Sequence, residues 1–275
     1  MSRYVLTKRR AALFALLVVF LSNPCASDAE TLLGKAVVGG ASIEIQFPVA
    51  KVFQDMAAQG GNPRVETGRA LLMFPPGFDP ARRWPILIVT STSDFNRTSP
   101  MDAEWYRRPA MAEGWMVLAS DATIKPRIDS TPWRLGMLAA TLDALQRKWP
   151  QAARWPVVFA GFSGGAKRSA ILGAMLAKSR AVNLRGFYLS GINEDRLTQS
   201  YRDYRAGGDF LGVPVWLSSG DADPIARPFD HQRVKASMEH AGFSRVRLET
   251  FRGGHEVKME EVQRALHWFR EVGRF

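Results

Sequence analysis

The sequence predicts a doubly wound α/β sandwich that forms a single domain. Short, continuous apolar segments end at polar or glycine residues, helical patterns lie between them, and the two alternate over about 200 residues. Continuous apolar segments of this length are typical of strands covered on both faces, as in a parallel sheet. The expected strands span 86–89, 115–119, 157–160, 187–189, 213–217 and 246–251.

The remaining elements follow from local patterns. Residues 34–74 contain apolar–polar alternation, for example over 42–47, and this predicts antiparallel strands at an edge of the sheet. Thr131 is the expected N-cap of a helix that has Pro132 at its first position and stops at Pro150. Further helices are expected over 166–178, 234–241 and 262–269.

The composition narrows the function classes. With 46% apolar and 23% charged residues, the chain is globular rather than disordered, collagen-like or coiled-coil. One cysteine excludes a disulfide framework and a thiolate zinc site, and four histidines argue against a histidine metal cluster, so we expect neither metal nor cofactor. The net charge of +11 suggests an acidic partner, such as an anionic envelope surface. Because the arginines are scattered and no nucleic-acid-binding motif occurs, we expect no nucleic-acid partner.

Residues 1–29 have the pattern of a secretory signal peptide. A basic start precedes an apolar segment over 11–21, which falls short of the roughly 20 residues that cross a bilayer, and small residues follow at cleavage spacing. Cleavage after Ala29 would leave 33 basic and 25 acidic residues, a net charge of +8, and no cysteine. We therefore expect a secreted or periplasmic domain over 30–275, without a transmembrane segment. The alternatives are an uncleaved amphipathic anchor, a lipid anchor and a twin-arginine route through Arg9 and Arg10.

The strongest chemical signal is Gly161-Phe162-Ser163-Gly164-Gly165. It lies between the strand over 157–160 and the helix over 166–178. A serine in such a turn projects its hydroxyl from the sheet edge, and the flanking glycines relieve crowding between strand and helix. The amino end of the helix also offers N–H groups to a developing oxyanion. The alternatives are a turn that only allows close packing and a phosphate-binding loop, for which the Walker spacing is absent.

A serine hydroxyl needs a base to remove its proton, and the base needs a carboxylate partner. His255 follows the strand over 246–251 and is the candidate base, because His231, His240 and His267 all lie within helical segments. Asp223 follows the strand over 213–217 and is the candidate acid, with Asp221 as its rival. All three candidates would stand at carboxyl ends of strands, where open α/β sheets place their sites.

With Ser163, Asp223 and His255 in this chain order, the sequence resembles the α/β-hydrolase superfamily from about Gly34 to the C-terminus. The stretches Gly-Phe-Ser-Gly-Gly-Ala and Gly-Gly-His-Glu (253–256) are similar to secreted esterases of the polyhydroxybutyrate-depolymerase and dienelactone-hydrolase type. The resemblance implies a mostly parallel central sheet with helices on both faces. It also implies that Ser163 is the nucleophile, His255 the base and Asp223 the acid.

One departure concerns the oxyanion hole. Members of the superfamily often carry His-Gly after the third strand, whereas here residues 90–94 read Thr-Ser-Thr-Ser-Asp. A backbone N–H of residue 91, 92 or 93 could serve, with Thr92 the expected donor beside the N–H of Gly164. Two segments, 94–109 and 193–210, are expected to shape the substrate pocket, and Tyr201, Tyr204 and Arg205 are the candidate substrate-binding residues. The alternative for these segments is a solvated lid helix.

The sequence therefore predicts an exported serine hydrolase that cleaves a small or polymeric carboxylic ester through an acyl-enzyme. A peptidase or a thioesterase would use the same residues. An α/β-hydrolase-fold protein that binds a ligand at the envelope without catalysis is the alternative from another class.

Overall fold

The computed structural model describes residues 30–93 and 97–275, so the signal peptide expected over 1–29 lies outside the described residues. The strands are β1 (Thr31–Leu32), β2 (Lys35–Ala36), β3 (Ser42–Pro48), β4 (Thr67–Met73), β5 (Ile86–Thr90), β6 (Met116–Ala122), β7 (Pro156–Phe162), β8 (Asn183–Ser190), β9 (Val215–Gly220) and β10 (Val246–Phe251). The helices are α1 (Lys51–Ala58), α2 (Ser99–Ala112), α3 (Thr131–Lys148), α4 (Gly164–Lys178), α5 (Arg196–Tyr204), α6 (Pro228–His240) and α7 (Met259–Gly273), with 3-10 helices at Pro150–Arg154 and Gly208–Gly212.

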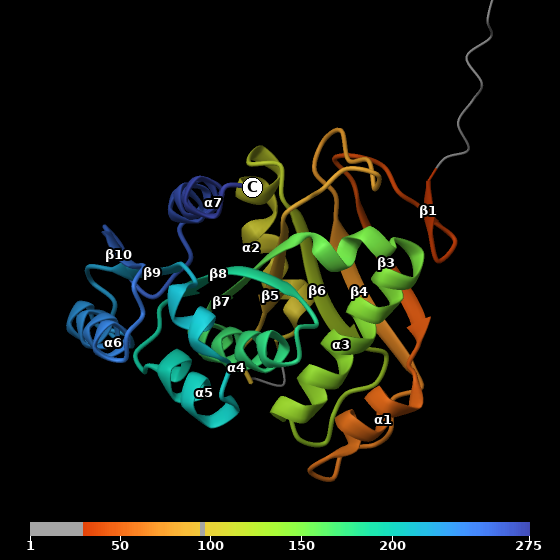
Figure 1. The fold of residues 1–275 in the computed structure, drawn as a ribbon, viewed down its shortest axis with the longest axis horizontal. Helices are drawn as coiled ribbons and strands as arrows, with labels where there is room; N and C mark the ends of the chain where they lie inside the picture. The colour runs from red at the N-terminus through yellow and green to blue at the C-terminus, as the bar shows by residue number, and fades with distance from the viewer. Residues whose placement is uncertain (1–29, 94–96) are drawn as a thin grey trace, which may run out of the picture.

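Eight strands form one twisted sheet in the order β10-β9-β8-β7-β5-β6-β4-β3 (Figure 1). All neighbouring pairs from β10 to β6 are parallel, and β4 is antiparallel to both β6 and β3. The antiparallel edge predicted from residues 34–74 is therefore confirmed, as is the mostly parallel sheet. Burial on both faces explains the continuous apolar sequences of the central strands, of which β5 is buried at every position.

Helices lie on both sides of the sheet (Figure 1), and an apolar layer separates each set of helices from it. Alternate residues of β7 point to opposite faces, so that Phe159 belongs to one core cluster and Val158 to the other. Helices α2 and α7 cover the Val158 face through residues such as Tyr106 and Phe269. Helices α1, α3, α4, α5 and α6 contribute to the cluster on the opposite face. The predicted arrangement of helices on both faces is confirmed.

The start of α3 differs from the prediction by one residue. Ser130, not Thr131, is the N-cap, because the Ser130 hydroxyl accepts a hydrogen bond from the Trp133 N–H at 3.3 Å. Both side chains are capping types, and the neighbouring loop decides between them, since the amide of Asn62 also donates to the Ser130 hydroxyl at 3.1 Å. Pro132 consequently occupies the second helical position.

Candidate active site

Ser163 lies at the sharp turn between β7 and α4. Its backbone has φ 54° and ψ −120°, a conformation that is strained for any residue with a Cβ. The Ser163 N–H donates to the Ser190 carbonyl at the end of β8, at 2.8 Å. This bond fixes the turn at the carboxyl edge of the sheet, where the partly exposed Ser163 side chain is accessible from solvent.

The glycines on either side of Ser163 make the turn possible through close backbone contacts. A Cβ on Gly161 would overlap the backbone of Gly165 and the nitrogen of Ala166, and a Cβ on Gly165 would overlap the Thr90 carbonyl oxygen. The end of β5, the end of β7 and the first turn of α4 thus meet where no side chain fits. This is the strand-to-helix packing expected of the motif.

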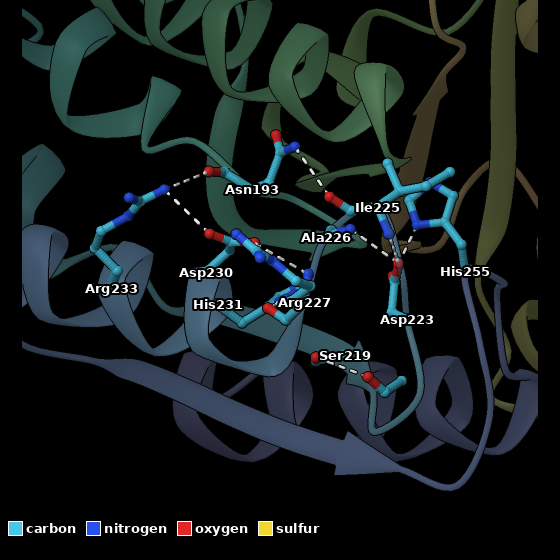
Figure 2. Close-up of polar contacts among 11 residues, drawn as sticks. Asn193, Ser219, Asp223, Ile225, Ala226, Arg227, Asp230, His231, Arg233 and His255 are labelled. Carbon is cyan, nitrogen blue, oxygen red and sulfur yellow. Dashed lines mark hydrogen bonds and ion pairs between the residues drawn. The ribbon is translucent and has the colours of Figure 1, made fainter.

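Asp223 and His255, which are 32 residues apart, meet at the ends of β9 and β10. The His255 Nδ1 and the Asp223 Oδ2 are 2.7 Å apart (Figure 2). The other carboxylate oxygen, Oδ1, accepts the N–H groups of Ile225 and Ala226, both at 2.8 Å. Burial raises the pKa of Asp223, but the hydrogen bonds from His255, Ala226 and Ile225 outweigh it, so the pKa lies below its usual value. The carboxylate is therefore charged at neutral pH and oriented toward the imidazole.

Asp221, the rival acid, has a different role. It is exposed, and its Oδ1 accepts the Gly253 N–H at 2.9 Å. This bond joins the loop after β9 to the loop after β10, two residues before His255. Asp221 thus contacts the backbone of the His255 loop, whereas Asp223 contacts the ring itself.

Phe162 and Gly191 bring the imidazole of His255 to the serine turn. The rings of His255 and Phe162 have centroids 4.4 Å apart, and a Cβ on Gly191 would lie 3.0 Å from His255 Cε1. Phe162 directly precedes Ser163, and Gly191 directly follows the residue that holds the Ser163 N–H. Within the described part of the chain, the ring of His255 is hydrogen-bonded to Asp223 and not to the Ser163 hydroxyl. Such bonds in free enzymes often tighten only when substrate binds.

Thr92 packs directly against Gly164. A Cβ on Gly164 would overlap the Thr92 hydroxyl and approach the Thr92 Cα at 3.3 Å. The neighbouring Ser91 N–H donates to the Ser99 hydroxyl at 3.3 Å and is thereby occupied. Of the three residues considered for the second oxyanion donor, Thr92 is thus beside Gly164 and Ser91 is engaged elsewhere.

A buried arginine that the sequence pattern did not indicate holds the loop over residues 91–93. Arg168 is 6% exposed, and it donates to the Ser93 hydroxyl and, at 3.5 Å, to the Asp129 carbonyl. The Asp129 carboxylate lies 3.8 Å from Arg168 and 2.6 Å from Arg134, which in turn donates to the Ser99 hydroxyl at 3.3 Å. Burial and the neighbouring Arg134 lower the pKa of Arg168, and Asp129 raises it. The pKa lies below its usual value because burial has the largest effect. This network, here called the loop brace, fixes both ends of the Ser91–Ser93 loop.

The three candidate substrate-binding residues lie away from the carboxyl edge of the sheet that carries Ser163. The Tyr201 ring stacks on Phe210 with centroids 6.1 Å apart, and Phe210 precedes β9 at the amino edge of the sheet. Tyr204 and Arg205 lie at the end of α5, next to Ala206, which lines a hollow together with the first residues of β8. Helix α5 begins at the carboxyl edge but runs toward the opposite edge, and it carries these side chains away from Ser163.

In the other expected pocket segment, 94–109, residues 94–96 lie outside the described residues. Trp105 packs edge-on against Phe162, with centroids 5.7 Å apart, and Arg97 lies over the Trp105 ring at 4.3 Å. Tyr106 is fully buried in the core instead. Trp105 and Arg97 therefore border the site on the α2 side.

Across residues 30–93 and 97–275, no group of three or more metal-ligating side chains could hold an ion. No helix in the same ranges is long and apolar enough to cross a membrane.

Solved structures similar to this one have the α/β-hydrolase fold. A hyperthermophilic esterase from Pyrobaculum calidifontis has a TM-score of 0.58 and 12% sequence identity, over 86% of this chain and 84% of that chain. The carboxylesterase EstE1, cloned from a metagenomic library, has a TM-score of 0.55 and 14% identity, over 84% of this chain and 88% of that chain. A thermostable esterase from Pseudomonas putida has a TM-score of 0.54 and 12% identity, over 89% and 83%. Neither a family model nor a curated protein matches the sequence.

The α/β-hydrolase fold predicted from the sequence is confirmed by this topology and these neighbours.

Proposed function

We propose that the protein is an exported serine hydrolase that cleaves carboxylic esters through Ser163, His255 and Asp223. The observation that carries the proposal is the 2.7 Å contact between Asp223 and His255, on the same sheet edge as the strained serine turn. A carboxylate that orients an imidazole beside a partly exposed serine is the arrangement that activates a hydroxyl for acyl transfer. The esterases of similar fold support an ester as the substrate.

In the proposed mechanism, the Ser163 hydroxyl attacks the ester carbonyl while His255 Nε2 accepts its proton. Asp223 accepts the Nδ1–H of the ring and stabilises the imidazolium that forms. The N–H groups of Gly164 and Thr92 donate to the oxyanion of the tetrahedral intermediate. His255 then protonates the departing alcohol, and water activated by the same ring hydrolyses the acyl-enzyme and regenerates Ser163. In this mechanism the acyl or alcohol group of the ester contacts Trp105 and Arg97, which border the site. It does not contact Tyr201, Tyr204 or Arg205.

A fluorophosphonate probe tests the proposal, because it phosphonylates only an activated serine and releases fluoride. We expect the wild type and Ser244→Ala, which removes an exposed hydroxyl outside the site, to be labelled, and Ser163→Ala to remain unlabelled. A folded wild type that resists the probe would favour the non-catalytic binding protein. Labelling of Ser163→Ala at the wild-type rate would assign the nucleophile elsewhere.

Two further measurements test which bond the protein cleaves and whether it is exported. A panel of oxygen esters, thioesters and peptides, varied in acyl length, would distinguish an esterase from a thioesterase or a peptidase. Intact-mass measurement of the protein recovered from its host would test export, because cleavage after Ala29 predicts a chain that begins at Glu30.

The loop brace supplies a prediction about catalytic geometry. Arg168→Met removes the guanidinium that holds Ser93 and Asp129, and it leaves Thr92 free to move relative to Gly164. We expect kcat for a nitrophenyl ester to fall by up to about 100-fold, with KM nearly unchanged, because a misplaced oxyanion donor weakens only the transition state.

The neighbouring lysine provides the control for Arg168. Lys167 pairs with the half-exposed Glu194 at 3.3 Å, so Lys167→Met should change kcat by less than about threefold. Arg168→Lys keeps the charge but not the planar fork, and it should recover only part of the rate. A folded Arg168→Met variant with wild-type kcat would show that the brace does not position the loop.

A further inference from the structure

Two adjoining hollows lie at the amino edge of the sheet, opposite the edge that carries Ser163. The first has a volume of about 560 Å³ and the second about 680 Å³, and both are lined by Arg180 and Val182. The arginines of these hollows stand just before or at the start of parallel strands. They are Arg82 and Arg83 before β5, Arg154 before β7, Arg180 before β8, Arg185 in β8 and Arg245 before β10, and together they are called the basic face.

The basic face has almost no compensating negative charge. All six arginines are exposed, and none forms an ion pair with a carboxylate of residues 30–93 or 97–275. No acidic residue lines the first hollow, and Asp209 is the one acid that lines the second. At the surface elsewhere in the described ranges, Arg64 and Arg107 pair with neighbouring acids, whereas Arg108 and Arg252 do not, so the clustering of six arginines is what distinguishes this face. Unpaired positive charge concentrated on one face attracts an anionic partner.

The chemistry of the face suits phosphate groups, and it favours lipid over nucleic acid. Arginine guanidinium groups match phosphate oxygens through paired hydrogen bonds. Proteins that bind single-stranded nucleic acid offer aromatic rings to the bases, but Trp155, the aromatic residue that lines the first hollow, is 1% exposed. None of the large apolar side chains that are exposed in the described ranges belongs to either hollow. The face therefore suits a surface of charged headgroups that it contacts without insertion.

We propose that the basic face binds the phosphate headgroups of an anionic phospholipid bilayer. Because this face is at the opposite edge of the sheet from Ser163, the candidate active site would point away from the bilayer and remain open to substrate. Attraction of this kind weakens as salt screens the charges. The inference does not depend on the proposed hydrolase activity, since it uses none of the residues at the carboxyl edge.

Sedimentation with vesicles tests the inference. Vesicles of phosphatidylcholine alone are compared with vesicles that contain one quarter phosphatidylglycerol, at low and high sodium chloride. We expect the chain that begins at Glu30, without the basic and apolar leader, to bind only the anionic vesicles and to be released by salt. The variant with Arg82, Arg83, Arg154 and Arg180 all replaced by Gln should bind them at least about 100-fold more weakly.

The matched control removes the same charge elsewhere. It replaces Arg64, Arg107, Arg233 and Lys235 by Gln, and each of these residues is paired with a carboxylate. We expect its vesicle affinity to fall by less than about threefold, and the thermal midpoints of both variants to stay near the wild-type value.

Three outcomes would overturn the inference. They are equal binding to neutral vesicles, equal loss of binding in the control, and tighter binding of duplex DNA than of anionic vesicles, which would make the face a nucleic-acid site. Because binding is measured without substrate, an inactive wild type would refute the proposed hydrolase and leave the vesicle result intact.

Discussion

Replacing Asp223 with asparagine is expected to lower kcat for an ester by about 10⁴-fold. The Asp223 carboxylate accepts the Nδ1–H of His255 at 2.7 Å while two backbone N–H groups hold its other oxygen. An asparagine that keeps both backbone bonds with its oxygen presents an amide NH₂ to Nδ1, and the opposite orientation loses both backbone bonds. In the first orientation the ring favours the tautomer that has its proton on Nε2, and it can no longer accept the Ser163 proton.

Asp221→Asn is the matched control, because it makes the same chemical change two residues earlier in the same turn. Asp221 is exposed and accepts one backbone N–H, which an asparagine side-chain oxygen can also accept. We expect kcat to change by less than about tenfold. Steady-state kinetics with a short-chain nitrophenyl ester, together with circular dichroism to verify folding, would compare the two variants. A larger loss in Asp221→Asn than in Asp223→Asn would contradict the assignment of the acid.

The sequence predicts the central strands well because strands that are buried on both faces consist of consecutive apolar residues. Strands β5 to β10 all overlap the predicted segments, and β10 matches residues 246–251 at both ends. Helix α2 is different, since residues 94–109 are expected only as a pocket segment, with a lid helix as the alternative, and Pro100 and Pro109 obscure the helical pattern. Pro100 occupies the first turn, where no N–H bond is lost, and α2 then packs on the sheet through Tyr106. Tertiary packing thus overrides the local signal.

The candidate site is predictable to the extent that strand ends locate it. The sequence predicts Ser163, Asp223 and His255 because each follows a strand, and parallel strands bring their carboxyl ends to one edge. Which of Asp223 and Asp221 contacts His255 depends on where each side chain points. The sequence of the turn that contains both residues does not show this. For a related reason the sequence does not reveal Arg168, and it does not reveal that Tyr201 lies against Phe210. Whether a helical side chain faces the site depends on where its helix is directed, and α4 and α5 are oriented by distant contacts.

Gly161→Ala is expected to lower the free energy of unfolding by about 3 kcal/mol, because the new Cβ meets backbone rather than a movable side chain. It would overlap the carbonyl of Gly165 and the nitrogen of Ala166. Relief requires α4 to move away from β7, and that movement displaces Ser163 and Gly164 together. We therefore expect the variant to lose ester turnover even under conditions in which it remains folded.

Gly212→Ala is the control for this effect. A Cβ on Gly212 would meet no atom within 4 Å, and its backbone conformation is open to alanine. Its free energy of unfolding should change by less than about 0.5 kcal/mol, with full turnover. Urea unfolding and ester kinetics on both variants would measure the difference. If Gly161→Ala matched Gly212→Ala in both, the serine turn would not depend on close backbone packing, and the strained Ser163 conformation would need another cause. If Gly161→Ala unfolded easily yet kept its turnover when folded, α4 would adjust without moving Ser163, and the proposed link between packing and catalysis at this turn would fail.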